Sequence, residues 1–332
     1  PLTIAGGANS SLGSSSTTFV NNTLKFQAGN LENSGDLNVS KGSQVIFSDT
    51  NSQITNNGEI QLNSDSNEFS RLIYRGSNYS GSGDFEYLRY VSNQTTAWDL
   101  IGSPVSGQTA SGLTSQGNIA GNGSGDFGLG TFDNTTGADG TWNTFDLTEA
   151  INEGNLDSGK GYVMGTNNGS TLTFAGNLVT ADVNVNITEG DSDGDPASAT
   201  GSRWNLIANP YPTYLSVTSG AAAASDNGSD YLMKTTNLAV LHANNKMIYV
   251  WNATNYTAIT EATAAASAVI APGQGFFVGG LHTDSGSPVF SFNTGMSTED
   301  GSDDGIAGLS GNGPSADAAD PDRAELFINL NS

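Results

Sequence analysis

Apolar and polar residues alternate over short segments along the whole chain, which is the pattern of half-buried β-strands. In the N-terminal part, residues 31–39 and 54–62 share the order apolar, any, Asn, any, Gly, acid, apolar, any, apolar. A repeat of this length, with short strands and Asn-Gly turns, predicts the coils of a β-solenoid over residues 1–84. Asn33 and Asn56 are expected to stack as a ladder inside the turns, and an ordinary hairpin meander is the alternative.

Residues 76–83 are rich in Gly and Ser and are interpreted as a flexible connector. The aromatic-rich segment 85–91 that follows is a strong strand candidate. The sequence therefore predicts that a new domain begins at residue 85.

Two motifs occur twice in the remaining sequence. Residues 98–105 (WDLIGSPV) are repeated as 204–211 (WNLIANPY), and 159–164 (GKGYVM) as 273–278 (GQGFFV). Trp142-Asn143 is taken to correspond to Trp251-Asn252. Copies of one motif set in the same order predict two tandem homologous antiparallel β-sandwich, jelly-roll-like domains at 85–190 and 203–332. Residues 191–202 form an acidic linker between them.

Alternation predicts strands near 141–147, 161–164, 171–174, 183–187, 247–251, 275–278 and 288–292. Residues 106–140 are interpreted as long surface loops, and 293–322 as an acidic loop before a terminal strand at 323–332. Ala-rich stretches at 221–224 and 260–268 are the two helix candidates. The fold class is therefore all-β.

Charge narrows the range of partners. Lys and Arg total 10 against 33 Asp and Glu, which gives a net charge of −23. Such a chain repels nucleic acid and anionic lipid, and no apolar run is long enough for membrane insertion. Cysteine is absent, so disulfides and thiolate metal sites are excluded. Because the sequence begins at Pro1, it is interpreted as a mature or trimmed chain.

Carboxylates at alternate positions form a candidate calcium site. Asp191, Asp193 and Asp195, with Glu189 beside them, have the spacing of a turn that wraps a hard cation. A standard helix-flanked calcium loop is excluded, since Pro196 and Ser202 stand where Gly and Glu are required. Ca²⁺ is therefore the cofactor expected, if any, and a solvated linker is the alternative.

Catalytic signatures are missing from the sequence. The two histidines, His242 and His282, lie in no nucleophile elbow, and no phosphate-binding loop is present. The tryptophans recur in both copies, which favours core packing over sugar stacking. Four tyrosines are expected to be more exposed and available to a ligand: Tyr211, Tyr214, Tyr231 and Tyr256.

The repeated motifs, together with Pro272–Val278 and the Asn-Gly coils, resemble a class of large, repetitive, β-rich surface proteins of Bacteroidota. The resemblance implies secretion, commonly by the type IX system, and an extracellular or cell-surface location. In similar proteins the segment equivalent to 322–330 continues into a further domain and a sorting signal.

The two ends of the sequence carry strand-like patterns. Leu326, Ile328 and Leu330 alternate on one face of a strand that also contains Phe327 and ends near Ser332, and Leu2 and Ile4 belong to a strand-like segment at the start. Donation of the last strand to an open sheet edge of a neighbouring copy would build a fibre, whereas local pairing is the alternative.

The preferred function is a non-enzymatic structural or adhesive surface protein that self-associates or binds other cell-surface components. A carbohydrate-binding accessory module of a polysaccharide-utilising system is the alternative. A lyase or hydrolase on a solenoid scaffold is a weaker third reading, because the chain holds only five arginines.

Overall fold

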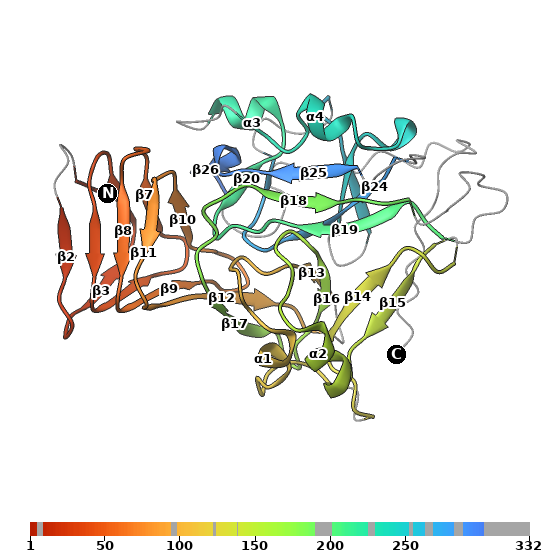
Figure 1. Ribbon diagram of the computed structural model, residues 1–332, viewed down its shortest axis with the longest axis horizontal. Helices are drawn as coiled ribbons and strands as arrows, with labels where there is room; N and C mark the ends of the chain where they lie inside the picture. Colours follow the sequence, from red (N-terminus) through yellow and green to blue (C-terminus); the bar gives the residue numbers. More distant parts are fainter. Residues whose placement is uncertain are drawn as a thin grey trace.

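The computed structural model describes residues 1–4, 9–93, 98–121, 124–137, 139–189, 201–224, 230–251, 255–262, 268–281 and 288–301. Among these described residues, strands account for about 46% and helices for about 10%. This confirms the predicted all-β class. The molecule is elongated, with a stack of coils at one end and two further β units at the other (Figure 1).

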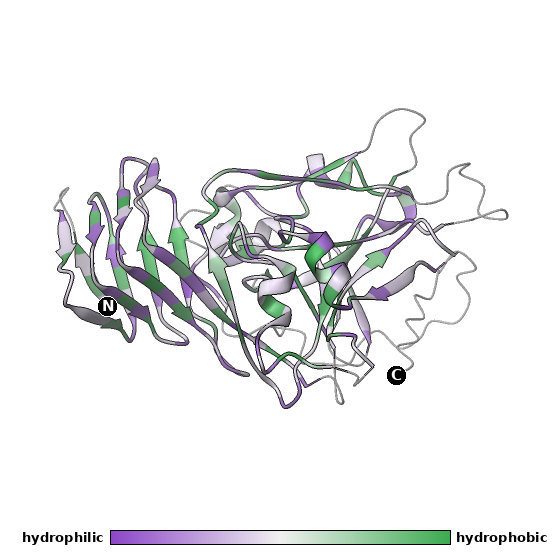
Figure 2. Cartoon of the chain, turned by 60° about the horizontal axis from the view of Figure 1, so that its bottom comes forward, coloured by the Kyte–Doolittle hydropathy of each residue, from purple (hydrophilic) through white to green (hydrophobic). Residues whose placement is uncertain are grey.

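The N-terminal region is a parallel β-solenoid of three-stranded coils. Corresponding strands of successive coils pair in parallel, in the orders β1-β4-β7-β10, β2-β5-β8-β11 and β3-β6-β9-β12. The strands are β1 (Leu2–Ile4), β2 (Ser10–Leu12), β3 (Thr17–Val20), β4 (Thr23–Phe26), β5 (Leu31–Asn33), β6 (Asp36–Val39), β7 (Gln44–Phe47), β8 (Gln53–Asn56), β9 (Glu59–Asn63), β10 (Arg71–Tyr74), β11 (Asn78–Ser80) and β12 (Asp84–Val91). The predicted solenoid is confirmed, and its strands alternate between hydrophobic and hydrophilic residues (Figure 2).

Identical positions of successive coils stack inside the solenoid. The rings of Phe26 and Phe47 are parallel, with centroids 4.3 Å apart. Asn33 Nδ2 donates to Asn56 Oδ1 at 2.8 Å, and both side chains are buried. The expected Asn ladder is therefore present, and it satisfies amide groups that burial would otherwise leave without partners.

A glycine occupies the turn that follows each ladder position, where successive coils approach closely. A Cβ on Gly58 would lie 2.0 Å from the carbonyl oxygen of Gly35, and one on Gly83 would lie 2.1 Å from that of Gly58. Residues 76–83, interpreted above as a connector, contain β11 and the corner of the fourth coil. The ladder ends there, because Tyr79 stands one coil above Ile54 and its hydroxyl meets Asn56 Nδ2 at 3.4 Å.

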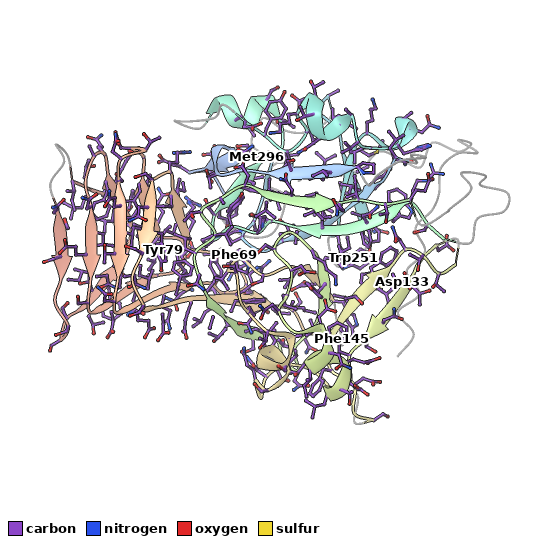
Figure 3. All side chains as sticks on the ribbon, viewed as in Figure 1. Phe69, Tyr79, Asp133, Phe145, Trp251 and Met296 are labelled. Atoms are coloured by element: carbon purple, nitrogen blue, oxygen red, sulfur yellow. The ribbon has the colours of Figure 1, made fainter. Side chains whose placement is uncertain are left out.

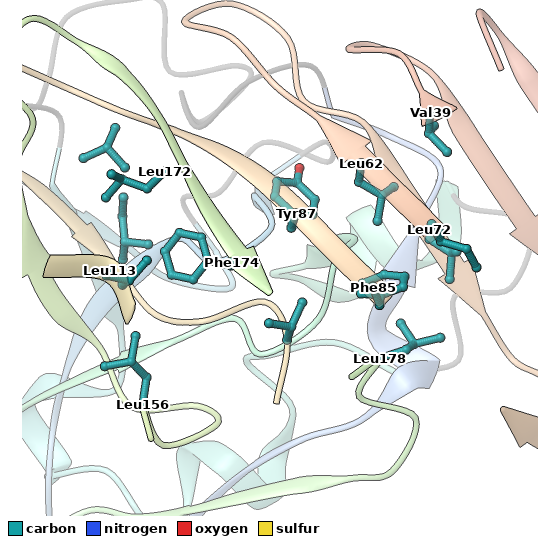
Figure 4. Close-up of a cluster of buried hydrophobic side chains, with 14 of the residues drawn as sticks. Val39, Leu62, Leu72, Phe85, Tyr87, Leu113, Leu156, Leu172, Phe174 and Leu178 are labelled. Carbon is teal, nitrogen blue, oxygen red and sulfur yellow. The ribbon is translucent and has the colours of Figure 1, made fainter. Parts of the chain in front are cut away.

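The solenoid and the next unit share a hydrophobic core. β12 pairs in parallel with β9 on one side and antiparallel with β17 on the other. Figure 4 shows Leu62 and Phe85 of the coils in one cluster with Leu113 and Phe174 from beyond them. The predicted boundary at residues 84 and 85 therefore falls inside a strand that belongs to both sheets.

The first unit after the solenoid has a four-stranded sheet in the order β13-β16-β14-β15, together with the β12–β17 pair. Its elements are β13 (Asp99–Ile101), α1 (Ala110–Thr114), β14 (Leu129–Asp133), β15 (Thr141–Thr144), α2 (Leu147–Glu153), β16 (Tyr162–Met164) and β17 (Ser170–Gly176). We call it copy 1.

The second unit, copy 2, repeats this plan. Its four-stranded sheet has the order β19-β24-β21-β22, and β18 pairs with β25 as β12 does with β17. Its elements are β18 (Val183–Asn186), β19 (Trp204–Ala208), β20 (Tyr214–Ser216), α3 (Ser219–Ala224), α4 (Thr235–Leu238), the 3₁₀ turn η1 (Ala243–Asn245), β21 (Ile248–Trp251), β22 (Tyr256–Ile259), β23 (Val269–Ile270), β24 (Gly275–Gly279), β25 (Val289–Phe292), the 3₁₀ turn η2 (Thr294–Met296) and β26 (Ser297–Thr298). β23, β20 and β26 form an additional sheet.

One predicted equivalence between the copies is wrong. Trp142 lies on β15, opposite Phe132, whereas Trp251 lies on β21, opposite Tyr256. Since β15 corresponds to β22, Trp142 corresponds to Tyr256, and Phe132 to Trp251. The two Trp-Asn pairs in the sequence therefore lie on strands that do not correspond.

Several local expectations also need correction. Residues 106–140 contain α1 and β14 rather than loops alone, and Leu113 and Leu129 are fully buried. The helix candidate at 221–224 lies within α3, whereas the described residues 260–262 of the other candidate are not helical. Tyr211 and Tyr214, expected to be exposed, are buried.

Copy 2 packs on the solenoid face formed by β4, β7 and β10. The Leu72 amide donates to Pro212 O at 2.8 Å. Lys25 Nζ lies 3.1 Å from Glu299 Oε1, and Arg71 Nη1 donates to Gly301 O at 2.7 Å. Two cationic side chains of the solenoid, Lys25 and Arg71, therefore bind the start of the acidic loop.

Candidate functional site

The two copies meet about an internal two-fold relationship. The Gly102 amide of copy 1 donates to Gly273 O of copy 2, and the Ala208 amide of copy 2 donates to Gly159 O of copy 1, both at 2.8 Å. Gly102 and Ala208 occupy the same place in the repeated motif, as do Gly273 and Gly159. Each motif of one copy therefore binds the glycine loop of the other.

Close approach explains why both loops keep glycine. A Cβ on Gly161 would lie 2.6 Å from Leu206 Cγ of copy 2. A Cβ on Gly275 would lie 2.8 Å from the carbonyl carbon of Leu100 in copy 1, and Leu100 corresponds to Leu206. The repeated Gly-x-Gly-aromatic motif is thus a packing device, and no chemistry needs to be assigned to it.

Aromatic side chains fill the contact between the two four-stranded sheets. The ring centroids of Phe132 and Phe277 are 4.9 Å apart, and Trp251 Nε1 donates to Trp98 O at 2.8 Å. Figure 3 labels Trp251 of copy 2 and Asp133 of copy 1. Trp142 and Trp204 belong to the same cluster. This confirms the expectation that the four tryptophans serve packing.

The internal symmetry breaks at β12 and β18. By strand register, Arg89 of β12 corresponds to Val185 of β18. Arg89 is fully buried, donates from Nε to Pro272 O at 2.9 Å and lies 4.1 Å from the centre of the Phe69 ring. Solenoid residues therefore seal one side of the interface between the copies.

The opposite side of that interface is a groove of about 470 Å³. We call it the inter-copy groove. Strand β18, strand β19, the end of β14 and the loop before β16 line it. Its polar residues are Asn134, Asp157, Ser158, Lys160, Asn184, Asn186 and Asn205, and its apolar residues are Phe132, Val185, Trp204, Leu206 and Ile207.

Hydrogen bonds hold the walls of the inter-copy groove. Asn134 and Asn205 both donate to Thr188 O, at 3.0 and 2.7 Å, and so join the two copies. Asn184 Oδ1 accepts from Ser291 Oγ at 2.7 Å, while Asn186 lies exposed on the same strand. The groove is therefore a built surface that still presents amide groups to solvent.

The cation in the inter-copy groove is already paired. Lys160 Nζ lies 2.6 Å from Glu153 Oε1 and 5.0 Å from the centre of the Tyr162 ring. Burial, and next the Glu153 charge, raise the pKa of the Tyr162 hydroxyl well above its usual range, so it donates as a neutral group to Glu153 at 2.9 Å. Asp157, which is exposed, contributes the remaining charge.

The predicted calcium residues are only partly within the described residues. Glu189 lies 3.8 Å from a guanidinium nitrogen of Arg203. Asp191, Asp193 and Asp195 lie outside the described residues. Among the residues that the structure does describe, no group of three or more His, Asp or Glu is placed to hold a metal ion. The calcium site remains a prediction.

Two of the six predicted assembly residues, Leu2 and Ile4, lie at the first coil. Leu2 is 63% exposed, and Ile4 is half-buried on β1. Leu326, Phe327, Ile328 and Leu330 lie outside the described residues. Sequence reasoning missed Phe19, which is 63% exposed on β3 of the same coil. The sequence did contain a signal for this surface, because residues 1–24, which include Phe19, contain no charged side chain.

Histidine offers no nucleophilic site in the described part of the chain. His242 Nδ1 meets Arg203 Nη1 at 2.9 Å and Asn245 Oδ1 at 3.1 Å, beside the η1 turn. His282 lies outside the described residues. His242 thus takes part in a structural network at the turn.

Comparison with known proteins gives one match. A family model described as a domain of unknown function (DUF8693) matches residues 10–305. The match covers the solenoid and both copies, so a single family model includes all three parts. No curated protein and no solved structure matches the chain. In the described residues, none of the helices is long and apolar enough to span a bilayer.

Proposed function

Because the chain belongs to the DUF8693 family, a domain of unknown function, we propose its function from its own geometry. It is a non-enzymatic extracellular structural or adhesive surface protein whose copies associate through the first coil of the solenoid. The observation that carries this proposal is that strands β1, β2 and β3 of that coil pair on one side only within the described residues.

The first coil presents three strand edges. In the described residues, β1, β2 and β3 each pair on one side only, with β4, β5 and β6. An edge of this kind presents backbone N–H and C=O groups that can pair with another chain. At the other end of the stack, β12 pairs with β17 and β10 contacts copy 2, so of the three last strands only β11 pairs on one side alone in the described residues.

Charge supports association at this end. Proteins usually protect exposed edges with charged residues. Here residues 1–24 carry no charged side chain, although the whole chain has a net charge of −23. Two copies therefore meet at this coil without the repulsion that their other surfaces would produce.

The proposed occupant of the open edge is the strand-like segment 323–332 of a neighbouring copy. Its alternating Leu326, Ile328 and Leu330 fit an added strand with one apolar face. Donation of this kind joins copies head to tail and does not close, so it builds a fibre.

We place the protein on the cell surface and treat each copy as an antiparallel β-sandwich. The resemblance to secreted Bacteroidota proteins supports the location. Core clusters in which the four-stranded sheet meets the two-stranded pair support the sandwich: Met164 with Phe174 in copy 1 and Val278 with Phe292 in copy 2.

Charge placed on the open coil tests the association. L2E and F19E add negative charge at two exposed positions, and L147E with I151E adds the same charge on α2, where both residues are also exposed. Negative-stain electron microscopy and sedimentation of folded protein should show assemblies for the wild type and the α2 control, and none for L2E/F19E. Equal assembly of L2E/F19E, or no assembly of the wild type, would refute the proposal.

The donor is tested separately. L326D/I328D should remain folded and lose assembly, and should still be incorporated into wild-type fibres as a terminal copy that accepts a strand. Normal assembly of this variant would exclude donation by residues 323–332 while leaving the coil edge as the interface.

A carbohydrate-binding accessory module is the second candidate function. The observation that favours it is the inter-copy groove, whose walls combine amides, a carboxylate and aromatic rings.

A further inference from the structure

We propose that the inter-copy groove binds a short, neutral oligosaccharide. This inference develops the second candidate function and does not depend on assembly through the first coil. The interface between the copies has two sides related by the internal two-fold, and one is sealed by side chains whereas the other is the open groove.

Folding alone does not require the groove. On the sealed side, Arg89 and Phe69 fill the space beside Pro272. On the open side the corresponding strand position is Val185, a much shorter side chain, and Ser158 stands where Pro272 does. The contact between the copies can therefore form with this space filled, as it is on the sealed side. The open groove on the other side is not needed for that contact.

The polar groups of the groove match sugar hydroxyls. Asn184 and Asn186 project from the solvent-exposed face of β18, two positions apart. Each amide both donates and accepts, as a hydroxyl does. The exposed Asp157 carboxylate, which copy 1 contributes to the groove, can accept from two adjacent hydroxyls through charge-assisted bonds.

The apolar residues supply a surface for the carbon face of a sugar. Phe132 is half-buried at the groove and Trp204 is 4% exposed, so Phe132 provides the larger accessible ring. A cavity of about 470 Å³ lies in the usual size range of small-ligand sites. A hydroxyl-rich ligand of more than one ring fits these dimensions and this mixture of groups.

Electrostatics selects a neutral ligand. Glu153 neutralises Lys160, so the groove keeps the negative charge of Asp157 in a chain of net charge −23. An anionic sugar would meet repulsion both at the groove and at longer range. Neutral glucans, xylans and mannans are therefore the expected ligand class.

Isothermal titration against neutral and uronic-acid oligosaccharides of matched length tests the inference. Trp204 in the wall provides a second readout by fluorescence. At least one neutral oligosaccharide should bind the wild-type chain, and D157A and N186A should each weaken it about tenfold, as expected for loss of one or two hydrogen bonds. N67A, an exposed asparagine on the solenoid, is the matched control and should leave binding unchanged.

Three outcomes would overturn the inference: no neutral oligosaccharide binds at millimolar concentration, D157A and N186A bind as the wild type does, or uronic-acid ligands bind more tightly. Assembly is scored on the same proteins. D157A and N186A should assemble normally, and L2E/F19E should still bind sugar. The proposals for the glycan site and for the coil interface can therefore be refuted separately.

Discussion

Arg89 occupies, on one side of the internal two-fold, the strand position that Val185 occupies on the other. The guanidinium is fully buried, donates to Pro272 O and Tyr90 O, and stacks on Phe69. The charge is thus spread over carbonyl dipoles and an aromatic face, which compensates part of its desolvation.

Replacing Arg89 should destabilise the protein strongly. Arg89→Met keeps much of the apolar volume but leaves the Pro272 carbonyl without this donor. We expect a loss of about 2–4 kcal/mol in the free energy of unfolding, because the partner group stays buried. Urea denaturation measures it. Lys41→Met, at a lysine whose side chain is 54% exposed, is the control and should leave the free energy of unfolding nearly unchanged.

Glycine substitutions at the contact between the copies should follow the nature of the atom that each new Cβ meets. Gly275→Ala meets the Leu100 backbone, whereas Gly161→Ala meets the side chain of Leu206, which can move. Both should destabilise by about 1–3 kcal/mol, with Gly275→Ala the more severe. Gly117→Ala has open space around it and is the control for thermal denaturation. A milder effect at Gly275 than at Gly161 would contradict this account of the interface.

The Asn ladder should be energetically coupled. Asn56→Ala removes the acceptor of the Asn33 amide and the donor to Asp84 O, and should cost about 1–3 kcal/mol. A double-mutant cycle with Asn33→Ala should give an interaction energy of about 0.5–2 kcal/mol, since the two side chains bond directly. Strictly additive costs would mean that the ladder contributes through its separate backbone bonds alone.

Carboxylates on the outer face of β6, β9 and β12 should make stability depend on pH. Burial raises the pKa of Glu59, and the charges of Glu86, Asp36 and Asp84 raise it further. Since the folded pKa is above the unfolded value, the folded state holds the proton more tightly. The contribution of Glu59 to stability is then fully present below about pH 4, the ordinary range of a glutamate, and is lost as the pH rises through the folded pKa.

Glu59→Gln should therefore stabilise the protein at pH 7, by about 0.2–1 kcal/mol, and have little effect at acidic pH. Added salt should reduce the gain, because it screens the neighbouring carboxylates. Chemical denaturation at two pH values checks this, with the exposed Glu32→Gln as the control. Equal gains from both substitutions would point to the net charge rather than to this face.

Patterns confined to one strand and its turn were readable from the sequence. The repeat that contains Asn33 and Asn56 predicted the coils, because stacked identical positions need identical residues. The fourth coil was missed since Gly81 replaces the Asn and Tyr79 the aliphatic residue. The capping box Asp146–Glu149 at the start of α2 was also visible in the sequence and was not used.

Features that depend on how the copies pack were not readable. The inter-copy groove joins Asp157, Asn186 and Phe132, which are separated in the sequence and lie on no common motif. Tyr214 was expected to be exposed, but it is buried. Its cover comes from the solenoid, where Arg71 lies 5.2 Å from the ring centre.

The contact between the copies has the isologous form of a symmetric homodimer, in which the same patch faces itself. Joining both halves in one chain replaces a concentration-dependent association by an intramolecular one. It also frees the two halves to diverge. A homodimer would be obliged to open or seal both of its lateral sites together, whereas this fused pair seals one against the solenoid and keeps the other open.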